Sequence, residues 1–205
     1  MDADFSAFIR AVIEGDIAST ARMLADNPEL AMRRFAAGAT RGNPKDFFIQ
    51  DIAHYLYKGD TALHMAAAAC QPATAELLVV AGADVRAKNR MGAEPLHYAA
   101  DSSRNPVAQF ETITYLISAG SDPNATNAQG VAPLHRAVRN RSAAAVRALL
   151  AGGADVRQKN KNGSTPHDLA TRNTGKSGSG SPNARAQQKE IIAVLLSALQ
   201  PTSLR

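Results

Sequence analysis

Short apolar stripes recur along the chain at helical spacing, and polar segments that contain glycine separate them. One kind of stripe is rich in alanine and begins with a Leu-His or Pro-Leu-His sequence, as in 95–100. The other kind is aliphatic, and its apolar positions are Leu77, Leu78, Val79; Ile113, Leu116, Ile117; Val146, Leu149, Leu150; Ile191, Val194, Leu195 and Leu196. Apolar residues three or four positions apart lie on one face of a helix. The pattern therefore predicts pairs of helices that are joined by polar turns.

The predicted helix pairs recur with a nearly constant period. Their aligned starts are 60–64, 93–97, 131–135 and 164–168, so the steps are 33, 38 and 33 residues. A second feature recurs at the same place in each unit: Asp84, Asp122 and Asp155 each lie eight residues before a glycine. Two landmarks in phase at this period are typical of a repeat protein, in which each unit buries its apolar faces against its neighbours.

Local signals mark where the helices begin and end. Thr61 and Thr165 suit the N-cap position, and proline at 95, 133 and 166 suits the first helical turn, where an amide needs no partner. Glycine at 82, 120 and 153 suits the left-handed residue that ends the second helix of a unit. These signals predict that each unit is a helix-turn-helix followed by a projecting turn.

These motifs are similar to those of the ankyrin-repeat proteins. The similarity rests on Pro-Leu-His at 95–97 and 133–135, its variants at 62–64 and 166–168, the Gly-Ala-Asp type of helix end and the 33-residue step. It covers residues 59 to about 200, and a weaker match at 5–32 resembles a capping helix pair. The resemblance implies an all-α fold, an ankyrin-repeat solenoid of stacked helix-turn-helix units with projecting turns.

Four positions depart from the family pattern at the helix starts. Ala62 replaces the proline of the first repeat, Glu94 and Ala132 replace the capping threonine, and His167 replaces the leucine of the fourth repeat. Loss of an N-cap side chain costs about 1 kcal/mol. We therefore expect weaker helix starts within an unchanged fold.

The repeat frame divides the chain into seven segments. Residues 1–32 form the N-terminal capping helix pair, 33–58 an aromatic and basic insertion, 59–91 repeat 1, 92–129 repeat 2 with a short insertion, 130–162 repeat 3, 163–200 repeat 4 with a Gly/Ser-rich insertion, and 201–205 the tail. Insertions in a solenoid become loops on one face, so they are candidates for function.

Composition fits closely packed helices, and the cysteine count indicates a reducing compartment or indifference to the redox state. Of the 205 residues, 45% are apolar but only 5% are aromatic and none is tryptophan, so the core must come from alanine, leucine, valine and isoleucine. The single cysteine, Cys70, excludes an internal disulfide and a cysteine-based zinc cluster, and we expect it to be a buried apolar residue. The acidic start Met1–Asp4 and the absence of a long apolar run predict no signal peptide, no membrane span and a cytoplasmic location.

The insertion at 33–58 holds five of the chain's ten aromatic residues, together with Arg33, Arg34, Arg41 and Lys45. One interpretation is a recognition flap with aromatic anchors. The other is a small core that shields the exposed edge of the first repeat. The residues that favour such a core are Phe47, Phe48, Ile49, Ile52 and Leu56, whereas Tyr57 lies in the turn. The pattern leaves both interpretations open.

The insertion at 171–183 has the composition of a flexible linker. It also contains a loose phosphate-loop pattern that ends in Lys176 and Ser177. A working phosphate loop follows a buried strand and opens a helix, whereas here a helix precedes the pattern and Gly-Ser-Gly-Ser-Pro follows it. Nucleotide binding is therefore disfavoured, and a looser anion-binding role for Lys176 and Ser177 remains open.

The histidine spacing does not indicate a metal or catalytic site. His64, His97 and His135 share one repeat position, and the resemblance implies that each ties adjacent turns together by hydrogen bonds. Layers of packed helices are about 10 Å apart, too far for these rings to share a zinc ion. His54 lies off the repeat register near Asp51 and Asp60, with no nucleophile at a recognisable spacing. We therefore expect no enzyme, no cofactor and no bound metal.

The resemblance implies that partners bind the concave face, which is built from turn tips and first helices. The corresponding positions are Tyr57, Lys58, Asp60, Ala68, Ala69, Arg90, Met91, Asp101, Ser102, Ala128, Gln129, Arg139, Asn140, Lys161, Asn162, Arg172 and Asn173. This set carries five basic and two acidic side chains, a net +3 out of the +5 of the whole chain. Arg139 and Arg172 suit bidentate binding of carboxylates, and Tyr57 and Met91 suit apolar anchorage.

The sequence therefore predicts a monomeric, non-catalytic scaffold that binds an acidic protein segment on its basic concave face. The alternative is a small-molecule, phosphate-binding or catalytic protein that uses the 33–58 flap and the 171–183 loop. Nucleic-acid binding is disfavoured, because the basic residues are dispersed and the chain contains no recognised nucleic-acid module.

Overall fold

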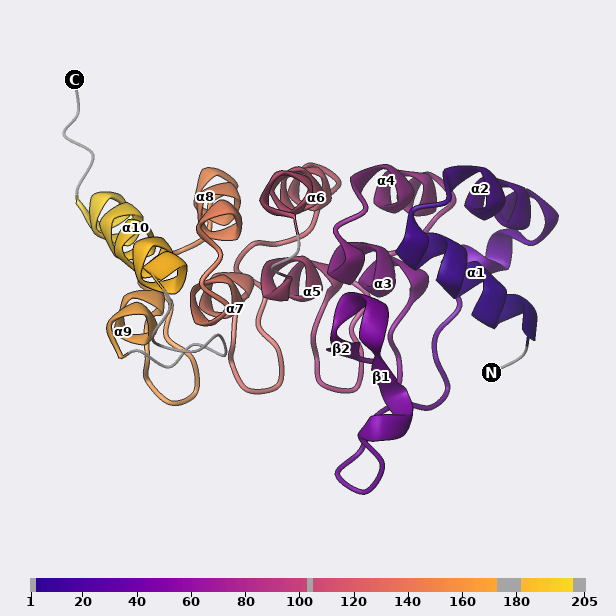
Figure 1. Ribbon diagram of the computed structural model, residues 1–205, viewed down its shortest axis with the longest axis horizontal. Helices are drawn as coiled ribbons and strands as arrows, with labels where there is room; N and C mark the ends of the chain where they lie inside the picture. The colour runs from indigo at the N-terminus through magenta and orange to yellow at the C-terminus, as the bar shows by residue number, and fades with distance from the viewer. Residues whose placement is uncertain (1–2, 103–104, 173–181, 201–205) are drawn as a thin grey trace.

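The helices stack in two layers along one direction of a solenoid (Figure 1). The computed structural model describes residues 3–102, 105–172 and 182–200. One layer contains the first helix of each pair: α1 (Ala3–Glu14), α3 (Ala62–Ala69), α5 (Pro95–Asp101), α7 (Pro133–Arg139) and α9 (Pro166–Thr171). The other contains α2 (Ile17–Asp26), α4 (Pro72–Val80), α6 (Pro106–Ser118), α8 (Ala143–Ala151) and α10 (Pro182–Leu199). The predicted all-α repeat solenoid is confirmed.

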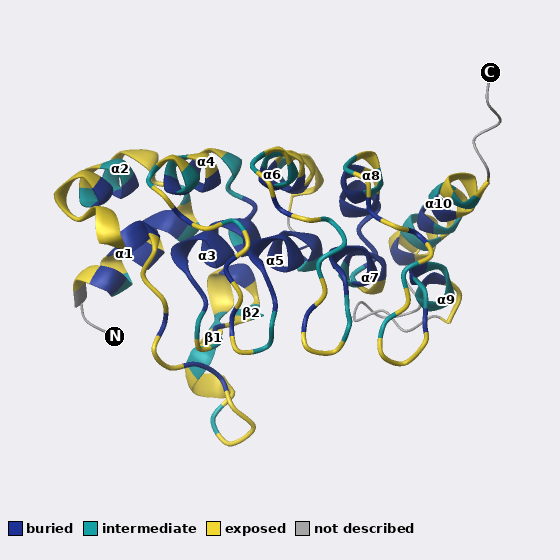
Figure 2. Cartoon of the chain, turned by 180° about the vertical axis from the view of Figure 1, so that it is seen from behind, coloured by how far each residue is buried: buried dark blue, intermediate teal, exposed yellow. Residues whose placement is uncertain are grey.

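The core is built from small residues, as the composition requires. Helices α3 and α5 are buried along almost their whole length (Figure 2), and alanines at 66, 67, 99 and 100 let the layers approach closely. Cys70 ends α3 with a positive φ of 54° and is 3% exposed, which confirms the expectation of a buried thiol. At the N-terminus, α1 buries Phe5, Phe8 and Val12, and the 3-10 helix η1 (Pro28–Ala31) follows α2. Among the described residues, no helix is long and apolar enough to cross a membrane.

Three histidines join the helix starts to the next turn. The Nδ1 atoms of His64, His97 and His135 accept the N-cap amide of their own helix at 3.1, 3.2 and 3.2 Å. Their Nε2 atoms donate to a carbonyl of the following repeat at 3.1, 3.0 and 3.1 Å; these carbonyls belong to Ala93, Val131 and Ser164. The implied role of these residues in tying turns together is therefore observed. We call this series of bonds the histidine ladder.

The ladder also explains why the cap substitutions leave the helices intact. Glu94 and Ala132 stand at the N-cap positions of α5 and α7, and in both cases the imidazole accepts the cap amide. Both helices then begin with proline, whose missing N–H needs no partner. The histidine thus pairs the N-cap amide of each helix whether or not the cap residue is threonine.

Successive turns also bond to one another along the edge of the stack. Arg90 N donates to Lys58 O at 2.8 Å, Ala128 N to Met91 O at 2.9 Å and Lys161 N to Gln129 O at 3.2 Å. The contact is close enough to require glycine: a Cβ on Gly92, whose φ is 70°, would lie 2.9 Å from the amide nitrogen of the next turn. Equivalent turn positions therefore recur side by side.

The 33–58 insertion folds into a small hairpin against the first repeat (Figure 1). It contains two 3-10 helices, η2 (Lys45–Phe47) and η3 (Gln50–Ile52), and two short antiparallel strands, β1 (Phe48–Ile49) and β2 (His54–Tyr55). Phe48 pairs with Tyr55, and Ile49 pairs with His54. These strands are a local departure from the all-α expectation.

The insertion combines features of both interpretations drawn from its sequence. Phe35, Ile52 and Leu56 are buried and form part of the core, as a shielding segment would. Phe48 and Tyr55 are 36% and 39% exposed, so the aromatic run is not a wholly buried patch. The hairpin therefore seals the first repeat and presents aromatic side chains on its outer face.

The ladder predicts a stability loss that is specific to its members. We expect His97→Leu to lower the free energy of unfolding by about 2–4 kcal/mol, because leucine leaves the amide of Glu94 and the carbonyl of Val131 buried and unpaired. Urea denaturation followed by circular dichroism measures this change. The control is His167→Leu, a half-buried histidine at the start of α9, which should change stability by less than about 1 kcal/mol. Equal effects of the two substitutions would contradict the role of the ladder.

The ladder also predicts a pH dependence of stability. Burial lowers the pKa of His97 to about 3, against 6.5 for the free side chain. The unfolded chain therefore binds a proton below pH 6.5 that the folded chain does not, and stability falls as the pH decreases from 6.5 toward 3. Between pH 7.5 and 5, His97→Leu should lose about 2 kcal/mol less unfolding free energy than the wild type. Parallel urea titrations at the two pH values test this, and an identical loss in both proteins would refute it.

Candidate functional site

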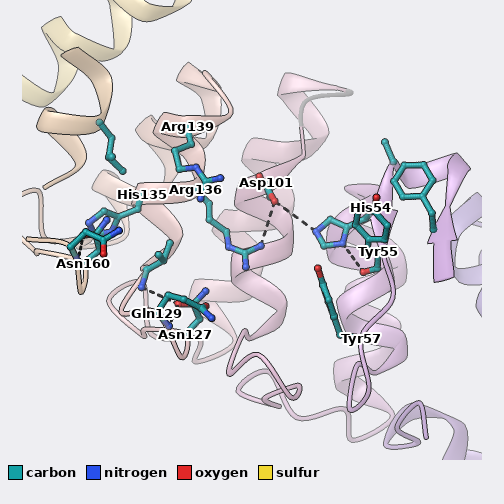
Figure 3. A pocket seen from close by; sticks show the side chains of 15 residues that line it. His54, Tyr55, Tyr57, Asp101, Asn127, Gln129, His135, Arg136, Arg139 and Asn160 are labelled. Carbon is teal, nitrogen blue, oxygen red and sulfur yellow. Dashed lines mark hydrogen bonds and ion pairs between the residues drawn. The ribbon is translucent and has the colours of Figure 1, made fainter. Parts of the chain in front are cut away.

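A groove of about 750 Å³ opens between the hairpin and the turns and first helices of repeats 2 to 4. One wall is formed by the hairpin, from which Phe48, His54, Tyr55 and Tyr57 line the groove. The opposite wall comes from the first helices, with Asp101, Arg136, Arg139 and Leu169. The turns supply the floor through Asn127, Gln129, Val131, Asn160 and Asn162 (Figure 3).

His54 attaches the hairpin to α5. Its ring stacks on Tyr98 with centroids 4.2 Å apart and an interplanar angle of 26°. Its Nδ1 lies 2.9 Å from Tyr55 O and donates to that carbonyl, so Nε2 faces Asp101 Oδ2 at 3.8 Å. Burial is the largest influence on the pKa of His54 and lowers it, although the carboxylate of Asp101 opposes the shift. The ring is therefore neutral near pH 7.

Two arginines one turn apart on α7 give the groove its positive charge. Arg136 Nη1 lies 3.4 Å from Asp101 Oδ2, and this arginine side chain is 17% exposed. Arg139 is exposed, and within the described residues it forms no ion pair. Because residues three apart lie on the same face of a helix, both guanidinium groups border the groove. With His54 neutral, the lining carries a net charge of +1.

A buried polar cluster lies beneath the hairpin. The carboxylate of Asp60 accepts hydrogen bonds from Tyr98 OH at 2.8 and 2.9 Å, from Asn89 Nδ2 at 2.8 Å and from Tyr57 N at 2.6 Å. Asp60 is 0% exposed. Burial and the charge of Asp60 raise the pKa of the Tyr98 hydroxyl. Three donors thus satisfy the buried carboxylate. A charged group that is buried needs such hydrogen-bond partners.

Two of the expected binding residues are buried. Asp60 was expected on the partner-binding face, but its carboxylate is buried and fully used by donors within the chain. Ser102, from the same expected set, is also buried at 8% exposure. Neither side chain reaches the surface where a partner would dock.

The groove includes five of the expected binding residues: Tyr57, Asp101, Gln129, Arg139 and Asn162. Others lie outside its lining, and these are Lys58, Arg90, Met91, Asn140, Lys161 and Arg172. Several of them have structural contacts: Arg90 donates to Ala39 O, Asn140 Nδ2 to Asp101 O at 2.6 Å, and Arg172 Nη1 to Ser164 Oγ at 3.2 Å. Asn173 and the possible anion-binding residues Lys176 and Ser177 lie outside the described residues.

The sequence interpretation missed several residues of the groove, namely Phe48, His54, Tyr55, Asn127, Asn160, Arg136 and Leu169. A repeat signal existed for some of them. Asn89, Asn127 and Asn160 occupy one repeat position, and Arg136 directly follows the ladder histidine of its repeat. His54 had no such signal, because its contact with α5 joins segments far apart in the chain.

The described residues contain no group of three or more histidine, cysteine, aspartate or glutamate side chains placed to hold a metal ion. What the groove offers is a set of hydrogen-bond donors, two cationic groups and an aromatic wall. Such a lining suits reversible binding of an extended, negatively charged ligand with apolar parts.

Comparison with known proteins identifies related sequences. The family model described as ankyrin repeats (3 copies) matches residues 8–127 and 107–201. A transient receptor potential cation channel subfamily A member 1 homolog from Caenorhabditis elegans is 36% identical over 87 residues. That match covers 41% of this chain and 7% of the relative, so the chain spans a small part of the relative's length.

The buried cluster predicts a stability effect of a single hydroxyl. We expect Tyr98→Phe to lower the free energy of unfolding by about 2 kcal/mol, because hydrogen bonds to charged groups contribute about 1.5–3 kcal/mol. The matched control is Tyr115→Phe, at a half-buried tyrosine of α6, which should change stability by less than about 0.5 kcal/mol. Urea denaturation of the three proteins measures both values. If Tyr98→Phe is as mild as the control, the hydroxyl does not stabilise Asp60.

Proposed function

Because the chain belongs to the ankyrin-repeat family, we propose that it is a non-catalytic scaffold that binds an acidic segment of a partner protein. Ankyrin repeats are generally protein-interaction scaffolds and are typically non-catalytic. The proposed binding site is the groove between the hairpin and α7. The observation that carries the proposal is the lining of this groove, with aromatic side chains on one wall and two arginines on the other.

The aromatic wall supports the binding of apolar residues of the partner. Phe48 and Tyr55 pack edge to face with centroids 4.9 Å apart, and each remains more than a third exposed. Tyr57 stands beside them in the lining, with the guanidinium of Arg90 5.6 Å from its ring centroid. Partly exposed rings held in place by their neighbours give contact area with little loss of side-chain entropy.

The arginines support the acidic character of the partner. The ion pair with Asp101 holds Arg136 in position, and α7 fixes Arg139 one turn away. A guanidinium binds a carboxylate through two parallel hydrogen bonds, and a preorganised one loses less entropy when it does so. Because the histidine ladder fixes α7 within the stack, both groups are presented on a rigid surface.

The test uses a probe peptide of defined chemistry, an N-acetylated and C-amidated hexapeptide of alternating leucine and glutamate with a fluorescent label. We expect it to bind the wild-type protein, and we expect Arg139→Glu to raise its Kd by about tenfold or more, because attraction becomes repulsion. Fluorescence anisotropy at low salt measures the Kd. Binding should weaken as salt is added, since screening reduces the contribution of exposed charges.

Two controls separate this proposal from general charge effects. Arg10→Glu makes the same charge change at an exposed position of α1, far along the stack, and should leave the Kd within about twofold. A peptide with glutamine in place of glutamate should bind the wild type much more weakly. No binding of the acidic probe, or equal losses from both charge reversals, would overturn the proposed site.

A further inference from the structure

The repeat frame aligns three positions that surround the groove. Asp60, Ala93 and Val131 share one position, four residues before the ladder histidine. A second position is asparagine in three successive turns, at 89, 127 and 160. The third position follows the ladder histidine or its equivalent and holds Tyr98, Arg136 and Leu169. The same geometry therefore recurs at successive junctions with different side chains.

At the junction of repeats 1 and 2, these three positions bind a carboxylate of the chain itself. Asn89 Oδ1 accepts the amides of Met91 and Ala93 at 2.9 and 3.0 Å, which closes the turn. Asn89 Nδ2 is then directed at Asp60 Oδ1 at 2.8 Å. Tyr98 OH donates to the same carboxylate at 2.8 and 2.9 Å. One turn asparagine and one helix residue thus form a two-donor carboxylate site.

At the junction of repeats 2 and 3, the donors recur but the carboxylate does not. Asn127 Oδ1 accepts the amides of Gln129 and Val131 at 2.9 and 3.0 Å, as Asn89 does in its own turn. Over the parts of the chain that the structure describes, its Nδ2 has no acceptor. The helix position holds Arg136, and the position of Asp60 holds Ala93, whose side chain has no acceptor to offer. Asn127 and Arg136 both line the groove.

We propose that Asn127 and Arg136 form a carboxylate subsite, in which a carboxylate of the partner takes the place that Asp60 takes between Asn89 and Tyr98. The inference rests on the proposed function and specifies where one acidic group of the partner binds. The ligand chemistry is a carboxylate, supplied by an aspartate or glutamate side chain or by a chain terminus.

Charge and geometry support a carboxylate at this position. Arg136 replaces a neutral hydroxyl by a cation with five N–H donors, so it can serve Asp101 and a ligand at the same time. Asn127 is 9% exposed and its Oδ1 is held by two turn amides, so its Nδ2 is a preorganised donor at the groove lining. The next junction has Asn160 but Leu169 at the helix position, so it lacks the second donor. The structure therefore assigns one such subsite within the groove.

The first test replaces the asparagine donor by an acceptor and keeps the hydrogen bonds that close its turn. Asn127→Asp keeps an oxygen for the amides of Gln129 and Val131 but replaces Nδ2 by a second carboxylate oxygen. We expect it to raise the Kd of the acidic hexapeptide by at least about tenfold. Asn105→Asp makes the same change at the exposed N-cap of α6, where Oδ1 also accepts two amides but the side chain lies outside the groove lining, and should leave the Kd within about twofold. Equal effects of the two substitutions would overturn the subsite.

The second test supplies the carboxylate from within the chain. Ala93→Asp places an aspartate at the position of Asp60 in the previous repeat, within the frame that holds Asn127 and Arg136. We expect the acidic hexapeptide to bind at least about tenfold more weakly while the melting temperature stays equal or rises. Val131→Asp is the control for stability, since its equivalent partners, Asn160 and Leu169, provide one donor only and its melting temperature should therefore fall. If Ala93→Asp does not fold, Asn127→Asp decides the question alone.

A third comparison identifies the source of the carboxylate. The capped acidic hexapeptide presents side-chain carboxylates only, whereas an N-acetylated hexapeptide of leucine and glutamine with a free C-terminus presents a terminal one only. Sensitivity of either peptide to Asn127→Asp supports the subsite and assigns the source. A second possible result is that the Kd of the acidic hexapeptide rises with Arg139→Glu but not with Asn127→Asp or Ala93→Asp. That result would overturn the subsite and leave the proposed function standing. Absence of wild-type binding would overturn both.

Discussion

Repeats 1 to 3 each depend on one imidazole that accepts an amide of its own helix and donates to a carbonyl of the next turn. This bond pair is the same at His64, His97 and His135, so it fixes both the helix start and the spacing between turns. It needs a neutral ring with its proton on Nε2: burial favours the neutral ring by lowering the histidine pKa, and the amide that Nδ1 accepts leaves the proton on Nε2. Every surface that crosses several repeats relies on this spacing.

The hairpin is the part of the molecule that breaks the symmetry of the stack. It covers the junction of repeats 1 and 2, where His54 stacks on Tyr98 above the buried carboxylate of Asp60. Beyond the hairpin the same face is open, and the groove begins there. The insertion therefore does two things at once. It closes the first junction with the chain's own groups, and it leaves its aromatic edge as one wall of the site.

The solenoid was predictable because its signals are local and repeated. Proline at helix starts, glycine at turns and the histidine position are each read within one unit, and the repeat confirms them several times. The groove was only partly predictable, because the hairpin occurs once and its placement depends on contacts between distant segments. Asp60 shows the difference: its turn position suggests exposure, but its buried carboxylate is bound by Asn89 and Tyr98, which lie 29 and 38 residues later. Arg136 was missed because the expected face emphasised turn tips and the helix positions farther from the ladder histidine.

The equivalence of junctions links the stability of this fold to the proposed carboxylate subsite. A buried carboxylate requires donors in fixed places, and the turn asparagine is held by its own backbone bonds before any carboxylate arrives. Where the chain supplies the carboxylate, the result is a buried structural cluster. Where it supplies alanine and an arginine instead, the same donors face an open groove with positive charge. Two changes at equivalent repeat positions, from Asp60 to Ala93 and from Tyr98 to Arg136, therefore separate the structural cluster from the proposed subsite, on turns held by the same backbone hydrogen bonds.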